Sequence, residues 1–375
     1  MSTSNVTFQS SLTLTDCLAE RIRKHGPITF HEWMKEALYH ETEGYYMRPD
    51  AEIWGRRWDY RTSPETSELF AATFARYVSG LFKELGNPDE FHFVECGAGD
   101  GRFAEGLLSS LQNSFPDTYE AINYCIDDVN KHRVSAISRR LQKFASKIEF
   151  TTLEAVRDLD PGIVFSNELL DTFPVHRLTK RNGELKELYV DVDDNDRFQW
   201  ITGSLSSPRL ADIYSQNGVD VVEDQIIEVS PEIDDWLTLV SEKLRRGYVV
   251  TVDYGAESHE LYRSQDRRSG TLRAYSRHKV VEVLEQPGER DVTVHVNWTR
   301  VRNVGTSLGL KTVTFQRQDK FLLDAGILHE LARLSSAVES ESAAARLALG
   351  AREMFLPNGM ATSFHVLVQA NRING

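Results

Sequence analysis

The chain has 375 residues, 41% of them hydrophobic and 26% charged, which is the composition of an ordinary globular protein. Its 43 basic and 56 acidic side chains give a formal net charge of −13, so general binding to nucleic acid or to anionic membranes is not expected. The three cysteines, Cys17, Cys96 and Cys125, show no paired or metal-ligand spacing, which argues against a disulfide framework and a zinc site.

The N-terminal 20 residues contain no Lys or Arg and no continuous apolar stretch, so they resemble neither a secretory signal nor a mitochondrial presequence. No apolar run in the chain approaches the roughly 18–20 residues that a membrane-spanning helix needs. These features predict a cytoplasmic protein.

Residues 1–90 are predicted to form a mainly helical N-terminal region that covers the active site. Apolar spacing favours helices at 14–24 and 69–85. Between them, Thr29 and Glu32 have the spacing of a capping box, which predicts the start of another helix.

From Phe91 the pattern changes to strands that alternate with helices, which predicts a doubly wound α/β sheet of parallel strands over 91–255. A hairpin at about 176–200, with Arg181-Asn182-Gly183 as its turn, interrupts this sheet. Residues 256–350 are expected to form a substrate cap, and 351–375 to return to the sheet through an alternating strand at 363–370. The strands are predicted at 91–96, 121–126, 147–150, 163–166 and 248–252, and the helices at 102–112, 131–144 and 231–246.

Three glycines, Gly97, Gly99 and Gly101, follow the strand at 91–96 and open the next helix. Glycine permits a positive φ there and lets a ligand touch the backbone, while the start of the helix offers unpaired N–H groups to an anion. The spacing does not fit a dinucleotide fingerprint, because the required third glycine would fall on Arg102 or Ala104. The turn alone leaves open a tight connection without a ligand.

Two acids, Asp127 and Asp128, end the second strand of the sheet. A carboxylate at this position can accept hydrogen bonds from both hydroxyls of a ribose. We favour Asp128, because the apolar alternation of the strand ends at Ile126; the other acid is then a solvated loop residue.

Beyond these features, the chain resembles the MidA-type methyltransferases, which are related to the arginine methyltransferase that assists assembly of mitochondrial complex I. Each block of the resemblance is only moderately specific, but their order and spacing along nearly the whole chain are highly specific. The blocks are Gly26–Phe30, Ala37–Tyr39, Gly44–Tyr46, Asp59–Ser67, the glycine turn, Ser166–Val175, Asp253–Gly255, Gly270–Tyr275 and Pro287–Val296.

The resemblance implies a class I methyltransferase fold, with a Rossmann-like, mostly parallel sheet whose last strand is antiparallel. It implies S-adenosylmethionine as cofactor and a protein arginine as acceptor. Its cofactor contacts would come from a set of residues on the second block, the glycine turn and the two strand ends that follow: Thr62, Glu65, Glu95, Gly97, Gly99, Gly101, Asp128 and Asn167. This chain departs from the family in the turn itself, where Asp100 adds a negative charge.

An arginine acceptor needs carboxylates that hold its guanidinium. Glu168 and Asp171 follow the fourth strand of the sheet, at the edge where ligands bind, and a helical turn would place both on one face. We predict that Glu168, and then Asp171, act in catalysis. The alternative is that Asn167 and Asp171 only cap a helix.

Further candidates for the acceptor site come from the last two blocks. Asp253 and Tyr254 end the fifth strand, and Tyr275, Arg277 and His278 belong to the predicted cap. Asp291, Thr293 and His295 alternate, so they would share one strand face that lines a cavity or an interface. His295 is a candidate general base, although a lone histidine is more often structural.

Two other functions stay open from the sequence. The same fold could methylate a small molecule on oxygen or nitrogen, or it could serve as a cofactor-binding assembly factor with little turnover. The expected partner is a protein substrate or a small acceptor, a homodimer is left open, and no metal ligand spacing is present.

Overall fold

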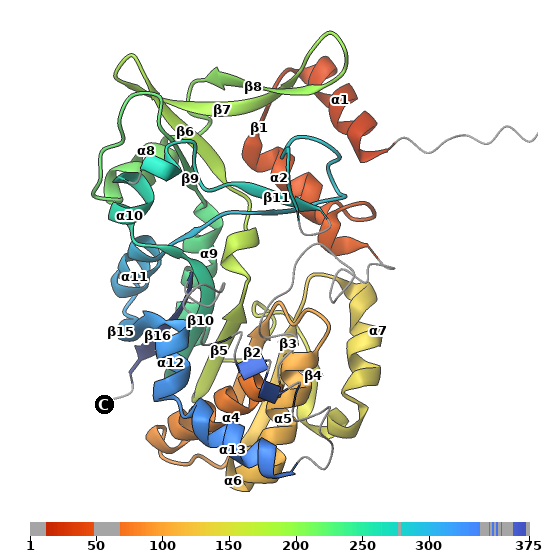
Figure 1. Cartoon of the computed structure of the whole chain (residues 1–375), viewed down its shortest axis with the longest axis vertical. Helices are drawn as coiled ribbons and strands as arrows, with labels where there is room; N and C mark the ends of the chain where they lie inside the picture. The colour runs from red at the N-terminus through yellow and green to blue at the C-terminus, as the bar shows by residue number, and fades with distance from the viewer. Residues whose placement is uncertain are drawn as a thin grey trace, which may run out of the picture.

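A computed structural model describes residues 13–48, 68–263, 265–276, 279–337 and 363–372, with isolated positions between 345 and 354. The described chain forms two lobes that lie end to end along the long axis of the molecule (Figure 1). We call the lobe around the large sheet the core lobe, and the lobe that carries the N-terminal helices the second lobe.

The core lobe is built on a sheet with the strand order β15-β16-β10-β5-β2-β3-β4, in which β16 alone runs antiparallel to its neighbours. The predicted fold class is therefore confirmed, including the antiparallel last strand. The strands are β2 (Phe91–Cys96), β3 (Ile122–Asp127), β4 (Ile148–Phe150), β5 (Gly162–Asn167), β10 (Gly247–Ala256), β15 (Lys311–Arg317) and β16 (Phe364–Asn371).

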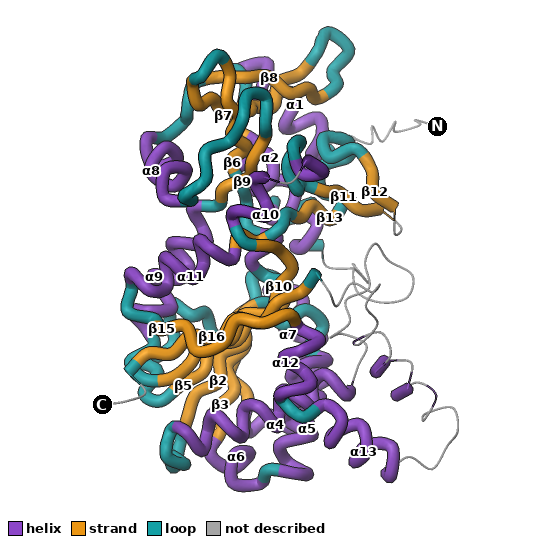
Figure 2. The backbone as a smooth tube through the Cα atoms, turned by 60° about the vertical axis from the view of Figure 1, so that its left-hand side comes forward, coloured by secondary structure: helices purple, strands orange, loops and turns teal. Residues whose placement is uncertain are grey.

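Helices cover both faces of this sheet, which Figure 2 shows nearly edge-on. One apolar cluster joins the sheet to α4, α5, α12 and α13, and another joins its opposite face to α9 and α11. Because both faces of the sheet are buried, its strands are rich in β-branched and aromatic residues. The helices of this lobe are α4 (Glu68–Glu84), α5 (Arg102–Ser114), α6 (Pro116–Ala121), α7 (Lys131–Arg140), α9 (Pro231–Lys243), α11 (Trp298–Ser307), α12 (Gln318–Asp324) and α13 (Ile327–Ala337).

The second lobe contains a five-stranded sheet and a three-stranded sheet, with orders β1-β7-β6-β9 (β8 beside β7) and β12-β11-β13. Its strands are β1 (Ile28–Thr29), β6 (His176–Arg181), β7 (Glu184–Val192), β8 (Phe198–Gly203), β9 (Ile226–Val229), β11 (Arg273–Ser276), β12 (Lys279–Val281) and β13 (Asp291–Thr293). Its helices are α1 (Leu14–His25), α2 (Phe30–Tyr39), α8 (Pro208–Gln216) and α10 (Ser258–Arg263). The 3₁₀ turns η1 (Tyr45–Met47), η2 (Gln142–Lys147), η3 (Leu170–Thr172) and η4 (Gln265–Arg267) and the short strand β14 (Val296–Asn297) complete the chain.

The predicted hairpin is confirmed: β6 and β7 pair around Asn182 and Gly183, which both have positive φ. The capping box of Thr29 and Glu32 is also present at the start of α2. Yet Ile28 and Thr29 pair with β7, so the N-terminal region is not purely helical. The packing explains the difference, since α1 and α2 bury their apolar faces against this hairpin and against β11 and β13.

The segment 256–350 was expected to form one cap, but it is divided between the lobes. Its three-stranded sheet lies in the second lobe, whereas α11 and β15 complete the core lobe. A short pairing of Gly255 with Val296 joins β10 to β14 where the two parts meet. The boundaries proposed at 90, 255 and 350 stay predictions.

Candidate active site

The order of the strands reverses between β2 and β5, and a crevice for ligands is expected at such a point, beyond the carboxyl ends of the strands. The glycine turn leaves β2 at this position. Gly97, Gly99 and Gly101 have φ values of 76°, 57° and 80°. A Cβ on Gly101 would also lie 2.9 Å from the Ile137 side chain, so both backbone and space require glycine there.

The Asp128 side chain lies against this turn, whereas Asp127 contacts the turn through its backbone carbonyl, which accepts the N–H of Gly97 at 2.8 Å. The Asp128 carboxylate accepts hydrogen bonds from the N–H groups of Asn130 (2.8 Å), Gly99 and Ala98. Burial raises its pKa, although these hydrogen bonds and Arg133 oppose the shift. Asp127 instead accepts the N–H of Leu153 at 3.0 Å. A half-buried carboxylate can accept hydrogen bonds from the two hydroxyls of a ribose, and glycine N–H groups can bind an anionic group. The site therefore fits a ligand that carries both.

Glu95 lies at the end of β2 and is buried. The hydroxyl of Tyr124 donates a hydrogen bond to it at 2.7 Å. Burial raises the pKa of Glu95 to about 8, and the charges of Asp128 and Asp100 add to the effect. In this environment an ammonium group of a ligand would favour the ionised form of Glu95.

Asp100, the unusual acid of the turn, points into an ionic cluster. Its carboxylate lies 3.0 Å from Nε of Arg102 and 3.5 Å from Nη2 of Arg140. It also accepts the N–H of Arg102, at 3.1 Å. Two arginines therefore compensate the added charge, which explains how the turn accommodates it.

The residues after β5 do not form the helical turn expected from the sequence. Glu168 has φ +50°, and Asp171 belongs to η3, so the two acids do not share a helix face. The alternative in which Asn167 or Asp171 caps a helix is not seen either, because Leu169 occupies the cap position of η3 without a side-chain hydrogen bond. Asn167 instead donates to Glu168 at 3.3 Å. Leu169 packs on the glycine turn, where a Cβ on Gly97 would lie 3.2 Å from it, so this loop lies next to the turn.

Asp253 is fully buried within β10 and holds η3 in place. Its carboxylate accepts the backbone N–H groups of Tyr254 (2.8 Å), Leu170 (3.0 Å) and Asp171 (3.3 Å). Burial raises its pKa to about 7. These contacts make it a residue that positions η3, and the acceptor contact predicted for it stays a prediction.

Asp171 is 2% exposed and lies beside Asp253. Burial raises its pKa well above the ordinary value, and the charge of Asp253 raises it further. It shares a hydrogen bond with the Tyr254 hydroxyl, which also interacts with Thr293. The Oδ1 atom of Asp171 is buried without a hydrogen-bond partner among the described residues.

The polar stripe of β13 meets this cluster. Asp291 and Thr293 are buried, and Asp291 is opposite Tyr275 in the β11–β13 register. His295 lies with its ring 5.6 Å from that of Tyr254. Burial lowers the pKa of His295 to about 4, with contributions from Arg267 and Arg273, so the ring is neutral and weakly basic at neutral pH.

Two tyrosines of the N-terminal region complete the cluster, and the sequence analysis did not single out either side chain. The Tyr39 hydroxyl donates to Thr172 Oγ1 at 2.9 Å, and that of Tyr46 donates to Asp291 at 2.6 Å. Burial raises the pKa of Tyr39, and the charges of Asp171, Asp291 and Asp128 raise it further. The signal for the two tyrosines in the sequence was that they belong to two blocks of the family resemblance, Ala37–Tyr39 and Gly44–Tyr46.

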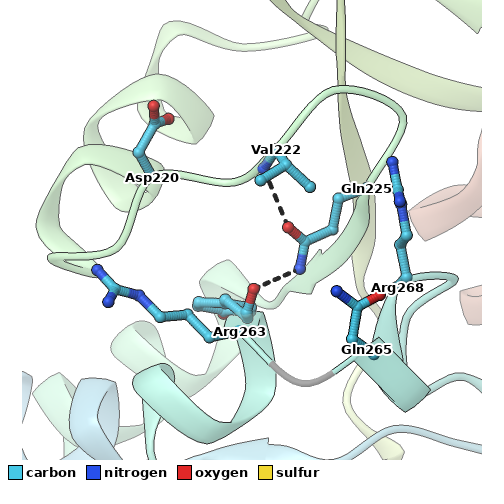
Figure 3. A pocket seen from close by; sticks show the side chains of 7 residues that line it. Asp220, Val222, Gln225, Arg263, Gln265 and Arg268 are labelled. Atoms are coloured by element: carbon cyan, nitrogen blue, oxygen red, sulfur yellow. Dashed lines mark hydrogen bonds between the residues drawn. The ribbon is translucent and has the colours of Figure 1, made fainter.

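Four predicted residues, Thr62, Glu65, Arg277 and His278, lie outside the described residues. A hollow of about 410 Å³ in the second lobe involves different side chains, including Arg263, Gln265 and Arg268 (Figure 3). None of the predicted site residues lines it. In the described part of the chain, no His, Cys, Asp and Glu side chains group as metal ligands, and no helix is long and apolar enough to cross a membrane.

The sheet order and the site at its switch point define a class I methyltransferase. The chain belongs to a family described as S-adenosyl-L-methionine-dependent methyltransferases, whose model matches residues 73–316. The predicted family is thereby confirmed, and with it an enzyme that uses S-adenosylmethionine, a cofactor that supplies a sulfonium methyl group.

Individual relatives agree with this assignment. A Drosophila melanogaster protein named as a mitochondrial protein arginine methyltransferase NDUFAF7 homologue is 25% identical over 326 residues, which cover 79% of this chain and 71% of the relative. The Homo sapiens protein arginine methyltransferase NDUFAF7 is 25% identical over 394 residues, covering 96% and 84%.

A crystal structure from Burkholderia thailandensis, bound to S-adenosyl-homocysteine, is similar over 96% of this chain and 92% of its own. It has a TM-score of 0.84 and 28% identity.

The predicted cytoplasmic location is wrong by the same comparison. The fly, mouse and human relatives are all named as mitochondrial proteins. The composition of the first 20 residues, on which the prediction relied, is a weak guide to location.

Proposed function

We propose that this enzyme methylates an arginine side chain of a protein, and that it binds the cofactor between the glycine turn and Asp128. The observation that carries the proposal is the buried acid cluster beside the turn, in which Oδ1 of Asp171 has no hydrogen-bond partner among the described residues. Buried carboxylates are normally paired, and a guanidinium is the partner that satisfies them with directed hydrogen bonds.

Charge and shape support the same acceptor. Glu168, on the loop that packs against the turn, is the carboxylate nearest in sequence to the strand end and is only partly buried. A partly buried acid thus lies on the loop that leads to the buried acid Asp171, which suits a side chain that enters from outside. The names of the NDUFAF7 relatives support protein arginine as the acceptor class.

Four tyrosines around the cluster, at positions 39, 46, 254 and 275, favour a second candidate. An aromatic enclosure would also suit a small acceptor with an amine or hydroxyl group. Incubation of a cell lysate with radiolabelled cofactor distinguishes the two, because label in the protein fraction supports the first candidate and label in small molecules supports the second. Mass spectrometry of a labelled protein then identifies the modified residue.

The Glu168→Gln variant tests the mechanism. The amide keeps the size of the side chain but loses the charge that holds a guanidinium, so we expect turnover to fall about a hundredfold. The affinity for S-adenosyl-homocysteine, measured by calorimetry, should stay the same because Glu168 lies outside the turn. Wild-type turnover in this variant would remove Glu168 from the mechanism, and Glu149→Gln on the partly exposed strand β4 is the matched control.

A further inference from the structure

Tyr46 has contacts with two different parts of the site. Its carbonyl oxygen accepts hydrogen bonds from Nδ2 of Asn130 at 2.7 Å and from Nη2 of Arg133 at 2.8 Å. Its hydroxyl donates to Oδ1 of Asp291 at 2.6 Å, and this bond is buried. One residue of the N-terminal region thus connects the loop after β3 with strand β13.

Asn130 is fixed on both sides, which makes this connection stiff. It is fully buried, and its N–H donates to the Asp128 carboxylate at 2.8 Å. Its Oδ1 caps α7 by accepting the N–H groups of His132 (2.9 Å) and Arg133 (3.3 Å). The amide therefore cannot rotate without breaking the helix cap, so its Nδ2 donor stays directed at Tyr46.

The far end of the connection lies in the acid cluster. Asp291 is opposite Tyr275 in the β11–β13 register, and its charge is among those that raise the pKa of Asp171. In the same cluster, Val294 donates its N–H to the carbonyl oxygen of Asp171 at 3.0 Å. A displacement of Asp291 would therefore change the side of the site that is proposed to receive the acceptor.

We propose that Tyr46 is a positioning residue that couples cofactor binding at Asp128 to the order of the acceptor side at Asp291. A ligand that holds the Asp128 carboxylate restricts Asn130, and through Tyr46 it restricts β13. The inference rests on the proposed cofactor site. It gives a physical basis for a coupling free energy between the two halves of the site, carried by a contiguous set of hydrogen bonds.

Hydrogen–deuterium exchange with S-adenosyl-homocysteine as the probe tests the coupling without an acceptor. In the wild-type chain, the probe should slow exchange both at 97–101 and at 291–297. In Tyr46→Phe, which loses only the hydroxyl, the probe should still slow exchange at 97–101, while the added protection at 291–297 falls about fivefold or more. Tyr248→Phe is the matched control, because it removes a hydroxyl that donates to Glu84 at the other end of β10.

A second variant keeps the proposal testable if Tyr46→Phe folds poorly. Asn130→Asp retains the oxygen that caps α7 but replaces the donor to Tyr46, and it should also reduce protection at 291–297. Equal protection at 291–297 in the wild type and in both variants would overturn the coupling. Absence of protection at 97–101 in the wild type would overturn the proposed cofactor site instead, so the two failures are distinguishable.

Steady-state kinetics add a readout that a purely structural role would not move. Tyr46→Phe should raise KM for the methyl acceptor identified by radiolabelling about fivefold or more at saturating cofactor, and leave the affinity for S-adenosyl-homocysteine measured without acceptor unchanged. A similar loss of this acceptor-free affinity would contradict a role on the acceptor side.

Discussion

At the scale of single residues, the site is dominated by acids whose pKa is raised by burial. Glu95, Asp171 and Asp253 are all buried, and burial is the first cause of each raised pKa. Buried carboxylates at the carboxyl edge of a sheet destabilise the fold unless a cationic ligand or a proton neutralises them. Such acids are functional candidates for this reason, and the sequence can show their positions but not their burial.

The titration of Glu95 should make the free energy of unfolding depend on pH, and the sign of this dependence can be worked out. Its pKa is raised from 4.5 to about 8 in the folded chain, so the protonated form is the one that folding favours. Its contribution to the free energy of unfolding is fully present below pH 4.5 and is lost as the pH rises through 8, with a slope of at most about 1.4 kcal/mol per pH unit.

Comparison of the wild type with Glu95→Gln isolates this contribution. Urea unfolding between pH 5 and 9 should show a difference in stability between the two chains that grows with pH in favour of the variant. A constant difference across this range would show that Glu95 does not titrate as described.

Gly99 tests the glycine turn itself. Its φ of 57° and its N–H, which donates to Asp128, place the backbone where a ligand would lie. Gly99→Leu should reduce affinity for S-adenosyl-homocysteine by about a hundredfold or more, because a side chain at this position strains the turn and fills the ligand space. Gly183→Leu, at a hairpin turn with φ 78° and open space around it, provides the matched control for backbone strain. Calorimetry that finds equal affinity in a folded Gly99→Leu chain would move the site elsewhere.

At the scale of elements, local patterns predicted most of the core lobe. The strand at 91–96 and the helix that begins at Arg102 lie where periodicity and the glycine turn placed them. The five-stranded sheet of the second lobe was not predicted, because its members come from distant parts of the chain. Strand β1 is two residues long and is defined only by its partner β7, so no local signal for it exists.

The candidate site also contains some residues that local patterns placed correctly and others that depend on contacts between distant parts of the chain. The positions of Glu95, Asp128 and Asp171 at strand ends followed from the alternation of strands and helices. The hydrogen bond of Tyr46 with Asp291 joins residues that are 245 positions apart, and it depends on how the N-terminal region packs against β13 within the second lobe. The positive φ of Glu168 also depends on tertiary packing. A local sequence pattern does not contain this information, and for that reason it predicted a helical turn at this position.

The pairing of β10 with β14 is the element on which the junction of the lobes depends. A Cβ on Gly255 would overlap the carbonyl group of Val296 and lie 2.7 Å from its nitrogen. Gly255→Ala should therefore destabilise the chain by about 2 kcal/mol or more. Gly80→Ala, on an exposed turn of α4 with nothing within 4 Å, should instead stabilise it by about 0.5–1 kcal/mol. Thermal unfolding of both variants measures the contrast, and an unchanged midpoint for Gly255→Ala would show that the strand pair is dispensable.

At the scale of the whole molecule, the two lobes place the acid cluster where the core sheet meets α2, η1 and β13. Neither lobe contains the complete cluster, because Asp253 lies in core strand β10 and Asp171 follows core strand β5, while Asp291 and the two N-terminal tyrosines belong to the second lobe. The acceptor side is therefore an interface within one chain, and its geometry depends on the packing between the lobes.

The net charge of −13 gives the last prediction. A basic protein acceptor would be attracted over distances of about a Debye length, roughly 10 Å at 0.1 M salt, so its association with this enzyme should weaken as salt is added. We expect kcat/KM for an arginine-rich peptide acceptor to fall on the order of tenfold between 20 and 300 mM NaCl (roughly a fourfold change in Debye length). The affinity for S-adenosyl-homocysteine, which carries no net charge at neutral pH, should change little and serves as the internal control. A kcat/KM that is independent of salt would argue against a basic protein surface as the acceptor and would favour the small-molecule candidate, since a neutral acceptor gains nothing from the field of the protein.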